Sequence, residues 1–184
     1  MKQLGPKEIA QIQAAPIYFI ATAPLSGDGT VNLSPKGLSD TIAVVDSSTV
    51  AYLDLTGSGA ETAAHLMENG RITIMWCSFG ATPNILRIYG SGSVHRPDSK
   101  RFGELIELFG DHLGVRGIVE VKIKLVKNSC GFGVPVAESF AERPDLDKWL
   151  QNKGAEALLE YQSRKNAVSI DGLDSWGAHM AAND

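Results

Sequence analysis

The sequence predicts an α+β fold in which short strands form a barrel or a sandwich. Seven short segments are rich in strand-forming residues or alternate between apolar and polar residues, and turn residues separate them. Two longer segments have the helical spacing of apolar residues. One lies between the last two strand segments, and the other follows all of them. The predicted strands are residues 17–23, 31–35, 41–46, 49–55, 71–79, 85–94 and 118–126.

Turn residues and the alternation of apolar and polar residues support several of these predicted elements. Segments 17–23 and 31–35 flank the glycine-containing turn SGDGT and are predicted to form a hairpin. In segment 118–126 apolar residues alternate with Glu120, Lys122 and Lys124, which is typical of a strand with one solvated face. Helices are predicted at residues 6–14, 98–109 and 145–165.

Composition narrows the class of protein. A length of 184 residues is typical of one domain, and no stretch approaches the roughly 20 apolar residues of a membrane span. The N-terminus lacks the apolar segment of a secretory signal, so a cytoplasmic protein without membrane association is expected. A net charge of −4 argues against a nucleic-acid-binding surface. Cys77 and Cys130 match no disulfide or CxxC pattern, and the histidines have no ligand spacing, so no metal is expected.

The stretch GSGAET, residues 57–62, joins an apolar strand segment to a candidate short helix at 61–69. It departs from the dinucleotide motif GxGxxG because Thr62 replaces the third glycine, and no Walker loop is present. Ser58 and Glu61 have the spacing of a capping box, in which Ser58 caps the helix. A helix start also offers free N–H groups and partial positive charge, so hydroxyls at Ser58 and Thr62 also suit a phosphate site. These residues favour the cap and leave both interpretations open.

The strand VNLSPKG at 31–37, the paired strands after it, the glycine turn with its helix, and RITIMW together resemble a known family. This family is the pyridoxamine 5′-phosphate oxidase-like proteins, whose fold is an FMN-binding split barrel. Segments SCGFGVP and KNAVSIDGL look like the tail of a subgroup. The resemblance implies a six-stranded antiparallel split β-barrel with flanking helices. It implies one FMN-binding domain over 1–184, with the barrel at about 15–127 and a C-terminal helical extension and tail at about 140–184.

The resemblance also implies which residues hold FMN. In such proteins the second strand contacts the flavin ring and supplies a basic residue to the phosphate, which the helix start receives. The residues at these positions here are Asn32, Leu33, Ser34, Lys36, Ser58 and Thr62. Arg87 lies on a strand that in the family passes near the flavin, often across a dimer interface. Glu61 and Thr62 stand where true oxidases have an Arg-Lys pair, so Glu61 is expected to turn away from the phosphate or join the cap.

An FMN-binding flavoprotein is therefore predicted, namely an oxidoreductase with no substrate indicated, and a homodimer with flavin at the subunit interface. No catalytic residue is indicated, because the cofactor itself carries the electron transfer. True pyridoxamine phosphate oxidases hold the substrate phosphate with arginine and histidine near the C-terminus. No arginine follows Arg164, so vitamin B6 oxidation is not expected. Two alternatives stay open: a protein that binds flavin or another ligand without turnover, and a structural protein whose glycine turn is only a cap.

Overall fold

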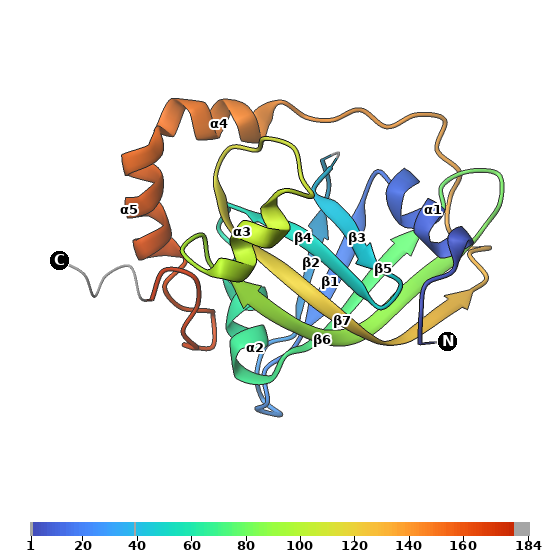
Figure 1. The fold of residues 1–184 in the computed structure, drawn as a ribbon, viewed down its shortest axis with the longest axis horizontal. Coiled ribbons are helices and arrows are strands. Elements are labelled where there is room, and N and C mark those ends of the chain that lie inside the picture. Colours follow the sequence, from blue (N-terminus) through green and yellow to red (C-terminus); the bar gives the residue numbers. More distant parts are fainter. Residues whose placement is uncertain (1, 39, 179–184) are drawn as a thin grey trace.

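The computed structural model describes residues 2–38 and 40–178. Within them seven strands form one antiparallel sheet in the order β2-β1-β5-β6-β7-β4-β3, which curves round the core (Figure 1). β2 and β3 are the two edges of the sheet. The strands are β1 (Tyr18–Thr22), β2 (Asn32–Lys36), β3 (Ile42–Asp46), β4 (Thr49–Leu55), β5 (Arg71–Cys77), β6 (Ile85–His95) and β7 (Val115–Ser129).

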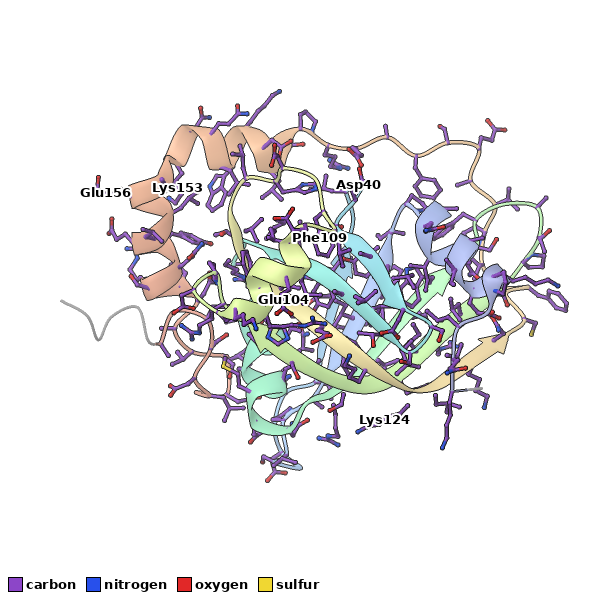
Figure 2. All side chains as sticks on the ribbon, in the orientation of Figure 1. Asp40, Glu104, Phe109, Lys124, Lys153 and Glu156 are labelled. Carbon is purple, nitrogen blue, oxygen red and sulfur yellow. The ribbon has the colours of Figure 1, made fainter. Side chains whose placement is uncertain are left out.

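Helices lie around the sheet (Figure 1). α2 ends at Gly70, whose positive φ of 70° is a conformation that glycine adopts without steric cost. Gly154 has a φ of 74° and separates α4 from α5, and Lys153 and Glu156 lie at the corner between these helices (Figure 2). The helices are α1 (Pro6–Ala14), α2 (Glu61–Asn69), α3 (Lys100–Ile106), α4 (Asp145–Lys153) and α5 (Ala155–Lys165).

The core lies on the inner face of the sheet. Ile20 of β1 pairs with Ile74 of β5, which pairs with Ile88 of β6, and all three side chains are fully buried. Successive residues of a strand point to opposite faces, so the residues between them point outward. Ile12 of α1 is buried in the same cluster. Burial of such a side chain contributes about 1.5–3 kcal/mol, so this face anchors the sheet.

The predicted fold class, an α+β antiparallel split barrel with flanking helices, is confirmed. Each of the seven predicted segments contains a strand, and the sheet therefore has one strand more than the six that the resemblance implied. The predicted helix at 145–165 is two helices because Gly154 interrupts it. No helix in the described part of the chain is long and apolar enough to cross a membrane.

Candidate functional site

A chain of polar side chains links β2 to the start of α2. Nδ2 of Asn32 donates to Oγ1 of Thr62 at 2.9 Å, and Oγ of Ser34 donates to Oδ1 of Asn32 at 3.0 Å. Asn32, Ser34 and Lys36 lie two residues apart and pair with the inward-facing residues of β1, so their side chains share the inner face. The structure therefore brings together three of the predicted residues, Asn32, Ser34 and Thr62.

The polar chain continues to a buried histidine on α2. Nδ2 of Asn32 also donates to Oγ1 of Thr22 at 3.3 Å, and this oxygen lies 3.0 Å from Nδ1 of His65. Oγ1 of Thr22 and Nδ1 of His65 are thus hydrogen-bonded, and the tautomer of the ring decides which of the two donates. Among the described residues, Nε2 of His65 has no hydrogen-bond partner. Burial lowers the pKa of His65, so the neutral ring is favoured.

The glycine turn does not form the predicted capping box. The N-cap of α2 is Ala60, which has no side-chain cap, and Ser58 lies exposed two residues earlier. Oε2 of Glu61 instead accepts from the backbone N–H of Ala60 at 3.0 Å. The prediction that Ser58 caps the helix is wrong, because the chain enters the helix only at Ala60. The expectation that Glu61 engages at the helix start agrees with this contact.

Lys36 forms an ion pair with a buried carboxylate. Its Nζ lies 3.0 Å from Oδ1 of Asp54, and Nε of Arg116 lies 3.1 Å from Oδ2. Nε1 of Trp176 donates to the same Oδ2 at 2.6 Å. Burial alone would raise the pKa of Asp54, but the charges and hydrogen bonds of Lys36 and Arg116 outweigh it and lower the pKa to about 2. Asp54 is thus ionised at neutral pH, and with its two cations the cluster has a net positive charge.

The tail after α5 holds the turn that precedes α2. Nδ2 of Asn166 donates to the carbonyl oxygen of Gly57 at 2.9 Å, and Oγ of Ser175 donates to that of Ala60 at 2.6 Å. These contacts join parts of the chain that are 109 and 115 residues apart. The position of the glycine turn therefore depends on the C-terminal extension.

Leu33 and Arg87 lie on the other face of the sheet from the polar chain. Leu33 is 65% exposed, and Arg87 on β6 pairs with the half-buried Met75 on β5. Nη1 of Arg87 donates to Oγ of Ser129 at 2.8 Å. Three strand spacings separate β2 from β6, which is roughly 14 Å. The structure therefore does not bring Arg87 to Asn32 within one chain.

Sequence reasoning missed four residues of this site. Asp54 had a local signal, since it is a lone carboxylate in the apolar strand TVAYLDL. Its partner Arg116, the buried His65 and the linking Thr22 had no such signal, because their contacts join residues that are 43 or more positions apart. Among the described residues, no group of three or more His, Cys, Asp or Glu could hold a metal ion.

Comparison with known proteins identifies relatives of the whole barrel. The family model of pyridoxamine 5′-phosphate oxidase matches residues 6–130. The pyridoxamine 5′-phosphate oxidase family protein ustO of Aspergillus flavus is 41% identical over 187 residues, which cover 92% of this chain and 73% of that protein.

Solved structures with low sequence identity share the fold. A candidate pyridoxamine 5′-phosphate oxidase from Lactobacillus delbrueckii superimposes with a TM-score of 0.55 at 17% identity, covering 69% of this chain and 95% of that chain. HupZ from Group A Streptococcus gives a TM-score of 0.53 at 16% identity, covering 68% and 98%. These likenesses concern the fold alone.

Proposed function

Because the chain belongs to the pyridoxamine 5′-phosphate oxidase family, we propose that it is an FMN-binding oxidoreductase. The observation that carries this proposal is the set of polar groups between β2 and α2. Asn32, Ser34 and Thr62 are joined by hydrogen bonds of 2.9 and 3.0 Å, on the strand and helix that hold FMN in the proteins this chain resembles.

These residues have the chemistry that FMN requires. Asn32, Ser34 and the backbone of Leu33 would hold the flavin ring, and Thr62 and Lys36 would hold the phosphate. Nε2 of His65, which has no hydrogen-bond partner among the described residues, is a further polar atom beside them. Amide, hydroxyl and ammonium groups suit a ligand with carbonyl and phosphate oxygens.

The charge balance also suits a phosphate. Lys36 and Arg116 together exceed the single charge of Asp54, and a helix start adds partial positive charge. Glu61 is the opposing carboxylate, but its Oε2 accepts from the N–H of Ala60. Ser58 is exposed just before the helix and can add its hydroxyl. The site would hold phosphate through hydroxyls and one lysine, where true oxidases have an Arg-Lys pair.

A homodimer completes the proposal. Arg87 points away from the inner-face residues of its own chain, so any flavin that it contacts would be one held by a partner. Leu33 and Tyr89 lie in one outward-facing row of the sheet, which continues to Leu125, and they are 65%, 36% and 42% exposed. An exposed apolar row is typical of a surface that another chain covers. A two-fold contact on this face would bury the row and bring Arg87 to the neighbouring subunit.

FMN supplies the electron transfer when bound, and the protein orients the ring, balances charge and excludes water. We assign no catalytic acid or base.

The visible spectrum of the purified protein, before and after FMN is added, tests the proposal. FMN should bind, and NADH or NADPH should reduce it and oxygen should reoxidise it. Bound FMN that neither nicotinamide reduces would favour a flavin-binding protein without turnover. A colourless protein that does not bind added FMN would contradict the proposal.

A further inference from the structure

A cavity of about 810 Å³ lies apart from the residues proposed to hold flavin. Residues of α1, of the loop between β5 and β6 and of the segment that follows β7 line it, and these elements lie near one another in Figure 1. None of the seven residues proposed for FMN lines it. Phe140 in its wall lies beyond residue 130, where the family match ends. A ligand bound here would therefore be independent of the proposed flavin site.

A chain of side-chain amides leads into this cavity from a carboxylate. Oε1 of Glu8 accepts from Nδ2 of Asn128 at 2.8 Å. Nδ2 of Asn84 donates both to Oδ1 of Asn128 at 3.0 Å and to Oε1 of Gln11 at 2.6 Å. All four residues line the cavity.

The carboxylate fixes the direction of every amide in this chain. Hydrogen bonds, including those from Asn128 and Gly5, outweigh burial and lower the pKa of Glu8, so it is ionised and can only accept. Asn128 must then turn its nitrogen to Glu8 and its oxygen to Asn84. Asn84 must in turn offer its nitrogen to Gln11. The end of the chain, Nε2 of Gln11, is necessarily a donor.

This donor has no partner. Among the described residues, Nε2 of Gln11 is a buried side-chain nitrogen without an acceptor. An unpaired buried donor costs about 1–3 kcal/mol, and an acceptor in the cavity would recover part of that cost. The nitrogen is covered in this structure, so an acceptor in the cavity can reach it only when the side chains that cover it shift.

The residues that line the cavity indicate which shape and charge a ligand should have. The rings of Phe79 and Phe140 pack with centroids 5.1 Å apart, and the backbone N–H of Ala137 donates to the carbonyl of Phe79 at 3.0 Å. The charged residues of the described lining are Lys7 and Glu8, whose charges cancel. A cavity of this volume falls within the roughly 300–1,000 Å³ of small-molecule sites. Aromatic walls and no net charge suit a flat, uncharged molecule.

We propose that this cavity binds an uncharged, flat organic molecule whose carbonyl oxygen accepts from Nε2–H of Gln11. The thiol-bearing residue Cys77 lines the cavity, whereas the exposed Cys130 does not. A ligand should therefore protect Cys77 from alkylation and leave Cys130 as an internal control.

Acetophenone and α-methylstyrene are suitable probes, because the second has the same shape with CH₂ in place of the carbonyl oxygen. Iodoacetamide labelling of both cysteines, followed by mass spectrometry, measures protection on the parent protein without any substitution. Acetophenone should protect Cys77 at roughly 2- to 10-fold lower concentration than α-methylstyrene, which corresponds to one neutral hydrogen bond. Gln11→Glu keeps an acceptor for Asn84 but removes the free donor, and should abolish this preference. Gln13→Glu, on the exposed part of α1, should retain it.

Three outcomes would overturn the proposal. One is no protection of Cys77 by acetophenone at its solubility limit. Another is equal protection by the two probes on the parent protein. The third is labelling of Cys77 that falls as protein concentration rises, which would mean that a second chain covers the cavity.

Discussion

Nε1 of Trp176 donates to Oδ2 of Asp54 at 2.6 Å, although 122 residues separate the two in the sequence. Both residues are buried. The ring of Trp176 also lies against Gly117, where a side chain would clash with it. The tail therefore closes on the barrel beside the ion pair of Lys36, so the stability of the tail and that of the site are linked.

Trp176→Phe should lower the free energy of unfolding by about 1.5–3 kcal/mol, because it removes a hydrogen bond to a buried charge and keeps most apolar contact. Chemical unfolding followed by circular dichroism measures this change. Trp149→Phe is the matched control, since Trp149 packs on Tyr161 in the helical extension. Equal losses in the two variants would contradict a special contribution of the bond to Asp54.

The same carboxylate predicts an acid-dependent loss of stability. The pKa of Asp54 is about 2 in the folded chain against an ordinary value of 3.8, so the unfolded chain binds a proton first as pH falls. Its contribution is fully present above about pH 4 and is lost toward about pH 2. The difference in free energy of unfolding between the parent and Asp54→Asn should therefore shrink from about pH 6 to about pH 3. The difference for the exposed Asp28→Asn serves as control, and a constant difference for Asp54→Asn would disprove the account.

Lys36→Ala should weaken FMN binding more than Glu61→Ala. A charge-assisted hydrogen bond contributes about 1.5–3 kcal/mol, or roughly 10- to 150-fold in Kd. Lys36→Ala should also melt lower than the parent, because it removes a partner of buried Asp54. Glu61→Ala loses the contact to Ala60, worth about 1 kcal/mol of stability, and should bind FMN at least as tightly.

Lys36→Arg is the control for this pair, since it keeps the charge. Flavin fluorescence titration and thermal melting of the variants measure both effects. If Lys36→Ala binds FMN like the parent, Lys36 forms the ion pair with Asp54 and does not hold the phosphate.

Much of the fold could be predicted because its signals are local. The alternation in segments such as 118–126 predicts a strand, and the spacing of Asn32, Ser34 and Lys36 already places them on one face. The helix at 61–69 was predicted with its observed bounds.

The rest depends on contacts between distant parts of the chain. Ser58 has the spacing of a cap, yet Asn166 and Ser175 hold the turn so that the helix begins later. The pairing of Lys36 with Asp54 requires strands β2 and β4 to meet in space, which no local pattern specifies. Tertiary contacts thus determine which partner each predicted site residue contacts.

Leu33→Asp should convert the proposed dimer into a monomer. It places a charge in the exposed apolar row, where a two-fold contact would bury it away from water, at a cost of several kcal/mol. Light scattering measures the mass. Leu108→Asp, which changes a leucine of 48% exposure beyond α3, should leave the dimer intact. A parent protein that is monomeric while it holds FMN would contradict the interface.

Calorimetric titration of the purified protein with FMN and, separately, with riboflavin tests the central claim most directly. The two ligands share the ring and differ in the phosphate, so their comparison isolates the phosphate site of Thr62 and Lys36. FMN should bind with a Kd at least about 10-fold lower than that of riboflavin, as one charge-assisted hydrogen bond requires. Equal affinity for the two ligands, or no binding of FMN, would contradict the account.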